Sequence, residues 1–245
     1  MLSKAQIKLI RSLQNKKFRK ETGLFVAEGK KLVEDISSSS IKVAHIYATN
    51  RYNGSLAHTL ITEEELSQVS TLTTPQAIIA LCYIPEASGQ LPDLKNELAI
   101  ALDDMRDPGN LGTIIRIADW FDIRNVFCSE ESVEVFNPKT VQATMGSIAR
   151  VNIHYVNLSE VLERYKNENI PVYGAMLEGK NVYEEALTQN GILVIGNEAN
   201  GISESVSRSI SHSIRIPSYA PNNSPESLNA AIATAVLCAE IRRRK

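Results

Sequence analysis

The stretch LAIALDDMRDPGNLGTIIRIADWF (98–121) is typical of a buried strand that passes directly into a helix. It begins with a short continuous apolar run between polar flanks, which indicates a strand buried on both faces. The turn Asp107-Pro108-Gly109 comes next, Asn110 is a suitable N-cap, and apolar residues then recur on one helical face. A strand, a polar turn and a helix in this order form the repeating unit of an α/β fold.

The same alternation continues from this stretch to the C-terminus. Strand-like runs lie at 98–104, 125–129, 151–156, 171–176, 192–196 and 213–217. Helical patterns lie between them, at roughly 111–121, 138–147, 158–169 and 203–210, and a last helix is predicted from Pro225 to Arg243. We therefore expect residues 98–245 to form an α/β domain with a mainly parallel sheet, in which ligands gather at the carboxyl ends of the strands.

Residues 1–90 show a different organisation. The basic N-terminus has apolar residues at helical spacing and is predicted to be an amphipathic helix. Thr62 and Glu65 form a capping-box signal before a short helix, and QAIIALCYI (76–84) is typical of a buried strand. Proline, glycine and polar residues then crowd PEASGQLPDLKN (85–96), which predicts a linker between a small first domain and the second domain.

The composition is that of an ordinary globular protein, with 245 residues, 43% of them apolar, and a net charge of −2. The total charge does not favour binding to nucleic acid, but its distribution does. The first twenty residues include seven Lys or Arg and no acidic residue, and the chain ends with Arg242-Arg243-Arg244-Lys245. Such segments can contact phosphate groups, although a solvated helix face and a frayed tail explain the pattern equally well.

The sequence offers no sign of a metal, a disulfide or a membrane segment. Cys82, Cys128 and Cys238 are scattered through apolar runs and belong to no CxxC pair. No apolar run approaches the roughly 20 residues that span a bilayer, and charges interrupt the N-terminal segment MLSKAQIKLI. We expect a protein of the reducing cytoplasm, without a metal and without a membrane partner.

Two further strand ends carry polar loops. In ILVIGNEANGIS (192–203), Gly196 and Gly201 flank a polar loop that places Glu198 at the end of the strand. In SIRIPSYAPNNSPESLNAAIATAVLCAEIRRRK (213–245), an N-cap and a first-turn proline at 224–225 would start the last helix. Residues 227–229 would then lie in its first turn, where free N–H groups point outward.

These loops have plain alternatives when each is taken alone. Arg116 near a helix N-terminus makes a plausible phosphate seat, but it is equally a surface arginine. The loop around Glu198 is equally an ordinary strand-to-helix connection. Other signatures are absent or incomplete, because the sequence has no GxG, GxSxG or HExxH. The segment GAMLEGKN (174–181) nearly matches a P-loop, but Asn181 replaces the Ser or Thr that would hold magnesium.

The three loops in this order resemble the three signature motifs of the SpoU (TrmH-type) class of RNA 2′-O-ribose methyltransferases, within the SPOUT superfamily. DPGNLGTIIRIADWF (107–121) is similar to the first motif, VIGNEANGIS (194–203) to the second and IRIPSYAPNNSPESLNAAIATAV (214–236) to the third. FRKETGLFVAEGKKLVED (18–35) is similar to the opening of the small RNA-binding domain that precedes many of these catalytic domains. Together these stretches extend over nearly the whole chain.

The resemblance implies properties that composition and spacing do not show. The catalytic domain, 98–245, should be a parallel-sheet α/β domain with a C-terminal trefoil knot, a rare exception to the unknotted rule. The first domain, 1–90, should be a small α/β domain similar to ribosomal protein L30e. The cofactor would be S-adenosylmethionine, bound by the knot loops. The partners would be ribosomal or transfer RNA and a second copy of the chain in a homodimer.

The resemblance also implies roles for particular residues. The expected catalytic residues are Asn110, Arg116, Glu198, Ser227 and Asn229. The expected cofactor-binding residues are Ala175, Met176, Gly196, Gly201, Ile216, Leu228 and Asn229. The expected RNA-binding residues are Lys16, Lys17, Arg19 and Lys20, together with Arg116 as a clamp on a phosphate next to the reacting ribose. No metal ligand is expected.

One segment departs from the pattern of this class. The loop SYAPNNSPE (218–226) is longer than usual in the third motif and contains no glycine. Because this loop would help to shape the cofactor pocket, it supports an alternative function. In that alternative, the chain is an RNA-binding protein of SPOUT fold that does not transfer methyl groups.

Overall fold

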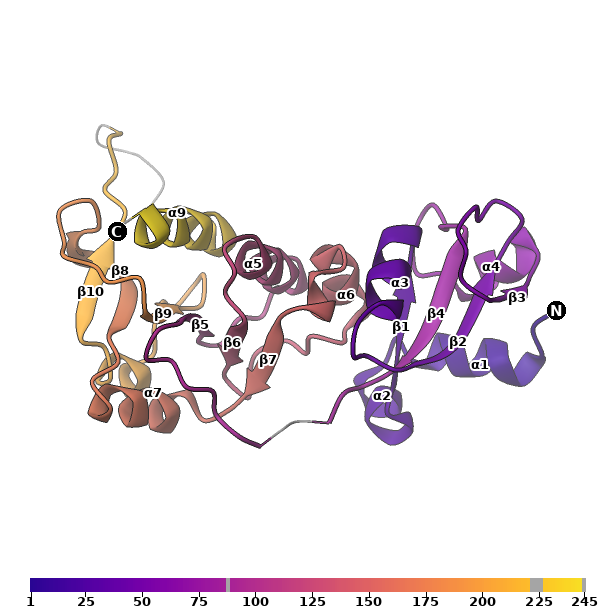
Figure 1. Cartoon of the computed structure of the whole chain (residues 1–245), viewed down its shortest axis with the longest axis horizontal. Coiled ribbons are helices and arrows are strands. Elements are labelled where there is room, and N and C mark those ends of the chain that lie inside the picture. Colours follow the sequence, from indigo (N-terminus) through magenta and orange to yellow (C-terminus); the bar gives the residue numbers. More distant parts are fainter. Residues whose placement is uncertain (87–88, 221–226, 244–245) are drawn as a thin grey trace. The chain divides into compact units, whose positions relative to one another are not determined.

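The computed structural model describes residues 1–86, 89–220 and 227–243. The chain divides into two compact units, shown in Figure 1. The first unit consists of Met1–Ser88 together with Glu134–Arg150, and the second of Gly89–Val133 together with Val151–Lys245. None of the helices in the described part of the chain is long and apolar enough to cross a membrane.

The first unit is built on a four-stranded sheet with the order β1-β4-β2-β3. Its strands are β1 (Leu24–Glu28), β2 (Val43–Ala48), β3 (Thr59–Leu60) and β4 (Ile78–Tyr83). Strand β4 is antiparallel to β1 and to β2, whereas β3 is parallel to β2. The predicted buried strand at 76–84 is confirmed as β4. The helices of this part are α1 (Lys4–Ser12), α2 (Lys16–Thr22), α3 (Lys30–Ser37) and α4 (Glu63–Val69).

Local sequence signals determine where two of these helices begin. The capping box predicted at Thr62 is present, since Glu65 donates its N–H to the Thr62 hydroxyl and accepts the Thr62 N–H. An equivalent box between Ser3 and Gln6 starts α1. The apolar sides of α1 and α4 then bury a cluster against one face of the sheet, which includes Ile10, Leu13, Leu66, Val69, Ile79 and Leu81.

A segment from the middle of the chain completes the first unit. Residues 134–150 contain α6 (Pro138–Thr144) and a short 3₁₀ turn, Ser147–Ala149, and α6 packs against β1. Phe136 stacks near Phe25, with ring centroids 4.8 Å apart, and Arg150 pairs with Asp35 at 3.3 Å. Chain order alone assigned this segment to the range 98–245, because sequence proximity does not reveal which surface a loop packs on.

The second unit contains a six-stranded sheet with the order β10-β8-β9-β5-β6-β7. All its strand pairs are parallel, as predicted. Helices α5 (Pro108–Trp120) and α9 (Ala230–Arg243) cover one face, and α7 (Leu158–Asn167) and α8 (Glu204–Ser207) lie on the other side (Figure 1). The strands are β5 (Leu98–Leu102), β6 (Asn125–Cys128), β7 (Asn152–Tyr155), β8 (Val172–Asn181), β9 (Gly191–Ile195) and β10 (His212–Arg215).

The two central strands explain why this sheet is parallel. Every residue of β5 and β9 is buried, because helices cover both faces, and continuous apolar runs are typical of strands in that position. The register pairs Leu102 with Ile195, so β5 and β9 end side by side. The loops that follow them therefore start from neighbouring points at one edge of the sheet. The C-terminal trefoil knot stays a prediction from the resemblance.

Candidate active site

The loop after β5 and the loop after β9 are bound to each other directly. The N–H of Asp103 donates to the carbonyl of Ile195 at 2.9 Å, which continues the strand pairing beyond the sheet. The buried Asp103 carboxylate accepts the N–H of Ser203 at 2.7 Å, at the far end of the second loop. Both ends of the loop 196–203 are thus held against the segment that leads into α5.

Helix α5 begins earlier than the sequence predicted. Asp107, not Asn110, is the N-cap, because its carboxylate accepts the N–H of Asn110 at 2.7 Å. Pro108 occupies the first helical position, where its missing N–H costs nothing. Two good capping residues lie three positions apart here, and the fixed backbone angle of Pro108 favours the earlier one. Asn110 is consequently in the first turn, with its side chain available for other contacts.

The side chains of Asn110, Glu198 and Asn229 form one hydrogen-bonded chain, which we call the amide–carboxylate chain. The Asn110 amide nitrogen donates to Oε1 of Glu198 at 2.5 Å. The Asn229 amide nitrogen donates to Oδ1 of Asn110 at 2.9 Å. Residues from the three predicted motifs therefore meet at one place. Each amide has its donor and acceptor sides assigned by its partners, so the orientation of the group is defined.

Asn229 also determines where α9 begins. Its Oδ1 accepts the N–H of Ala231 at 3.0 Å and that of Ile232 at 3.3 Å, which is the contact that a capping side chain makes. The helix starts at Ala230, so the prediction that it begins near Pro225 is wrong. Ser227, Leu228 and Asn229 precede the helix instead of forming its first turn. The predicted cap at 224–225 lies outside the described residues.

The other expected catalytic residues are exposed. Ser227 comes two residues before Asn229 and is open to solvent. Arg116 lies on the outer face of α5, about 120° around the helix from Asn110 at 3.6 residues per turn. The structure thus brings Asn110, Glu198 and Asn229 together, whereas Arg116 lies on a different face of α5 from Asn110.

Gly196 and Gly201 are needed for the shape of their own loop. Asn197 and Gly201 exchange two backbone hydrogen bonds, of 3.0 and 2.9 Å, which close the loop tightly. A Cβ on Gly196 would lie 2.2 Å from the carbonyl carbon of Gly201, so no side chain fits there. Gly201 has a φ of 67°, in the left-handed region that favours glycine.

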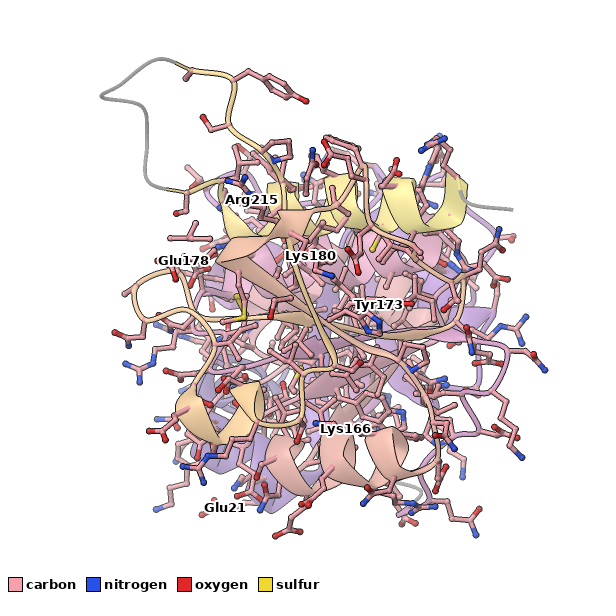
Figure 2. The ribbon with its side chains drawn as sticks, turned by 90° about the vertical axis from the view of Figure 1, so that its left-hand side faces the viewer. Glu21, Lys166, Tyr173, Glu178, Lys180 and Arg215 are labelled. Carbon is pink, nitrogen blue, oxygen red and sulfur yellow. The ribbon has the colours of Figure 1, made fainter. Side chains whose placement is uncertain are left out.

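The expected cofactor residues on β8 lie where this strand leaves the sheet. Its pairing with β10 jumps from Gly174 opposite Ser213 to Lys180 opposite Ile214. Residues 175–179, which include Ala175 and Met176, therefore bulge out between two paired parts of β8. Figure 2 views this side of the unit, with Glu178 and Lys180 from β8 and Arg215 from β10. Met176 is 36% exposed and Leu228 is 50% exposed, so both present apolar surface to solvent.

The basic N-terminus divides into exposed and buried residues. Lys16, Lys17 and Lys20 are exposed on α2 and remain candidates for RNA contact. Arg19 is only 2% exposed, so the prediction that it contacts RNA is wrong. Its guanidinium donates to the carbonyls of Leu13 and Gln14 and pairs with the Glu134 carboxylate at 2.6 Å. Four of its five N–H groups are bonded inside the unit, so this buried side chain holds the fold together and does not reach a phosphate at the surface.

The basic N-terminus, which the sequence indicates as a phosphate-contacting segment, contains a second exposed group on α1. Lys4, Lys8 and Arg11 are exposed and recur at helical spacing, so they share one face of α1. The spacing is visible in the sequence, on the side of the helix opposite the buried Ile10 and Leu13.

The described residues contain no cluster of His, Cys, Asp or Glu that could hold a metal. Burial raises the pKa of Cys82, Cys128 and Cys238 to about 12, so these thiols stay protonated at neutral pH.

Comparison with known proteins assigns the chain to a family. Residues 97–239, more than half of the chain, match the family model of the SpoU rRNA methylases. The chain belongs to the SpoU rRNA methylase family. Residues 4–80 of this SpoU protein match a second model, the MRM3-like substrate binding domain. The class suggested by the three motifs is thereby confirmed.

Relatives of this SpoU protein extend over its whole length. The 23S rRNA (guanosine(2553)-2′-O)-methyltransferase RlmP of Bacillus subtilis is 30% identical, covering 97% of this chain and 96% of RlmP. A TrmH-family protein from Porphyromonas gingivalis superposes with a TM-score of 0.88 at 39% identity, over 100% of both chains. An AdoMet-bound rRNA methyltransferase from Sinorhizobium meliloti gives a TM-score of 0.85 at 30% identity, over 99% of this chain and 97% of that one.

Proposed function

We propose that this SpoU protein transfers a methyl group from S-adenosylmethionine to a ribose 2′-hydroxyl of ribosomal or transfer RNA. The observation that carries the proposal is the amide–carboxylate chain of Asn110, Glu198 and Asn229 at the ends of the central strands. The names of RlmP and of the AdoMet-bound relative support both the reaction and the cofactor. Of the two kinds of RNA, the similarity to RlmP favours ribosomal RNA, because RlmP is named as a 23S rRNA methyltransferase.

The residues at the site fit S-adenosylmethionine. Leu228 and Met176 offer exposed apolar surface, and the half-buried Ile216 adds to it. The loop between Gly196 and Gly201 is closed by its own hydrogen bonds, and its residues 198–201 are exposed where a cofactor could contact them. We assign cofactor binding to Ala175, Met176, Gly196, Gly201, Ile216, Leu228 and Asn229. When bound, the cofactor supplies a methyl group on a sulfonium, which is already activated for displacement.

The protein must align the ribose and accept one proton. The 2′-oxygen forms a bond to the methyl carbon, the bond from that carbon to sulfur breaks, and its electron pair stays on sulfur. The hydroxyl proton leaves toward the Glu198 carboxylate or the neighbouring phosphate. We assign Arg116 the role of a two-pronged clamp on that phosphate and not the role of a base, because a guanidinium is a bidentate donor without an acceptor. The reaction requires no metal, because the sulfonium already activates the methyl carbon.

The RNA is first held through its phosphates by the exposed lysines of the first unit. Lys16, Lys17 and Lys20 contribute from α2, and the exposed basic face of α1 adds Lys4, Lys8 and Arg11. We therefore assign RNA binding to the first unit, mainly residues 1–90, and catalysis to the second unit, which lies within 98–245 apart from the segment 134–150. The target nucleotide is splayed from a loop, where its ribose is accessible. We propose a cytoplasmic location as well, because a protein that methylates ribosomal or transfer RNA must reach these RNAs there.

A homodimer would complete the site. Arg116 is exposed and lies about 120° around α5 from Asn110, and Trp120 on the same helix is 84% exposed. Ile232, at the start of α9, is 55% exposed. Large exposed apolar side chains on neighbouring helices are typical of a surface that another protein covers. We propose that a second copy of the chain covers this surface.

Methyl transfer to RNA tests the function directly. Purified protein with labelled S-adenosylmethionine should label ribosomal RNA from a strain that lacks the gene, and little label should enter RNA from the parent strain. Mapping of 2′-O-methyl groups would then identify the nucleotide. Activity in excess EDTA is expected to persist. Loss of activity that magnesium restores, with RNA folding unchanged, would contradict the metal-free reaction.

The alternative function is RNA binding without methyl transfer. The long loop at 218–226 supports it, and residues 221–226 of that loop lie outside the described residues. Calorimetric titration with S-adenosylmethionine separates the two functions. Binding in the micromolar range supports the methyltransferase, whereas no binding to the folded protein supports the alternative.

A further inference from the structure

The side chain of Asn197 contacts both loops of the candidate site, its own loop after β9 and the loop after β5. Its Oδ1 accepts the N–H of Ala199 at 2.8 Å and that of Asn200 at 3.2 Å. Its amide nitrogen donates to the carbonyl of Asp104 at 2.8 Å, across 93 residues of sequence. One half of the side chain thus shapes the turn that contains Glu198, and the other half ties this turn to the loop after β5.

The partner of this bond is itself firmly held. Asp104 has a φ of 53°, an uncommon backbone conformation for a residue with a side chain. Its N–H donates to the hydroxyl of Ser129 at 2.9 Å, and its carboxylate pairs with Arg106 at 2.9 Å. The hydroxyl of Ser132 accepts the next N–H, that of Met105, at 3.0 Å. Asp104 is therefore a fixed point to which Asn197 can anchor the second loop.

We propose that Asn197 is a positioning residue, which holds the Glu198 carboxylate at hydrogen-bonding distance from Asn110. The proposal rests on the proposed function, since it assigns Asn197 a part in the same reaction. Asn197 is adjacent to Glu198 in the chain, so rotation of its own turn would move the carboxylate. Small displacements of a reacting group can cost roughly a hundredfold in rate, so the bond to Asp104 matters beyond its contribution to stability.

The replacement Asn197→Asp removes only the donor. The carboxylate keeps the acceptor for Ala199 and Asn200, but it faces the Asp104 carbonyl and carboxylate with no proton to donate. We expect kcat to fall roughly ten- to hundredfold, with little change in KM for the cofactor. The loss should shrink relative to the parent protein as the pH is lowered toward about 5.5, because protonation of the new carboxyl restores a donor. Asp104 raises the pKa of that carboxyl, since two like charges would otherwise lie side by side.

Asn190 provides a matched control at the opposite end of the same strand. It immediately precedes β9, is partly buried like Asn197, and donates its amide to the carbonyl of Lys95 at 2.7 Å, across 95 residues. Asn190→Asp therefore removes the same kind of bond from the same unit, far along β9 from the site. It should lower the melting temperature about as much as Asn197→Asp and leave kcat unchanged. Equal losses of kcat in both variants would mean that Asn197 acts only through stability.

A second measurement does not depend on catalysis. In ¹H–¹⁵N correlation spectra, the chemical shifts of the side-chain amides of Asn110 and Asn229 report directly on the hydrogen bonds of the amide–carboxylate chain. Asn197→Asp should shift both signals, and Asn190→Asp should shift neither. Unchanged signals in a folded Asn197→Asp variant would overturn the proposal. If the parent protein fails to methylate any RNA, the proposed function fails, while the NMR result still decides whether Asn197 positions Glu198.

Discussion

The side-chain amide of Asn229 donates to Oδ1 of Asn110 at 2.9 Å, although the two residues are 119 positions apart in the chain. The same Asn229 side chain caps helix α9 through its oxygen, so one residue links the start of α9 to the start of α5. The position of Asn110 against Glu198 thus depends on a helix that comes at the end of the chain. Replacing Asn229 can therefore have two separate effects. Loss of its oxygen removes the cap of α9 and lowers stability, and loss of its amide nitrogen removes the bond to Asn110.

Asn229→Asp and Asn229→Ala should differ in stability but not in activity. The aspartate keeps the cap on Ala231 and Ile232, whereas alanine loses it at a cost of about 1 kcal/mol. Both replacements remove the donor to Asn110, so both should weaken S-adenosylmethionine binding and slow methyl transfer. Thermal unfolding and calorimetric titration of the two variants would check this. An aspartate variant that binds cofactor as tightly as the parent protein would argue against a role for the amide nitrogen.

Arg116→Lys should keep the positive charge and lose most of the activity. Lysine cannot reproduce a planar, two-pronged contact with a phosphate. A lost charged hydrogen bond is worth about 1.5–3 kcal/mol, or roughly ten- to hundredfold in rate if it acts only in the transition state. Cofactor affinity should hardly change, since Arg116 lies on the outer face of α5, away from Asn229. Turnover close to that of the parent protein in the folded variant would show that Arg116 is a surface residue without a role in catalysis.

Much of the second unit could be predicted because the information lies in short, contiguous patterns. The apolar runs at β5 and β9 and the polar loops after them indicate a parallel sheet with a site at its carboxyl edge, and the structure has this sheet, with both loops starting at one edge. Helix starts are harder to predict, since Asp107 and Asn110 are both good caps. For α9, the sequence predicts a start near Pro225, but the capping side chain is that of Asn229, four residues later. The choice of cap on α5 matters for the candidate site, because the cap at Asp107 leaves the side chain of Asn110 free to bind Glu198.

Other features depend on contacts between distant residues and could not be predicted. Nothing in the sequence distinguishes Arg19 from its neighbouring lysines, and only the packing of residues 134–150 provides the Glu134 carboxylate that Arg19 pairs with. The bond from Asn197 to Asp104 is of the same kind, since it spans 93 residues. Short motifs predict which residues would carry the chemistry. They did not indicate which residues hold those side chains in place.

Replacing Arg19 should unfold the first unit, whereas replacing Lys20 should only weaken RNA binding. Arg19→Met leaves the Glu134 carboxylate, which is 15% exposed, without its bidentate partner, and breaking such a pair costs about 3–5 kcal/mol. Lys20→Met removes an exposed charge, so stability should change little while RNA affinity falls and depends less steeply on salt. Thermal unfolding and RNA titrations at several salt concentrations would compare the two. A stable Arg19→Met variant with selective loss of RNA affinity would restore Arg19 to the RNA-binding surface.

Trp120 offers a direct test of the proposed homodimer, because it is the chain's single tryptophan and is 84% exposed. If a second copy covers α5, tryptophan fluorescence should shift to longer wavelength on dilution, as the indole becomes exposed to water. Trp120→Ala should weaken the dimer by about 2 kcal/mol or more, roughly thirtyfold in its dissociation constant, since buried tryptophans dominate such interfaces.

Leu60→Ala provides the control for this change. Leu60 is 54% exposed on β3 of the first unit, so its truncation also removes exposed apolar surface but does not alter α5 or α9. Sedimentation velocity across a range of protein concentrations would give the dissociation constants of both variants. A dimer equally stable in the Trp120→Ala variant, or fluorescence that does not change on dilution to monomer, would place the interface elsewhere. In that case α5 would stay open to solvent, and Arg116, four residues before the end of this helix, would have to act on RNA bound to its own chain.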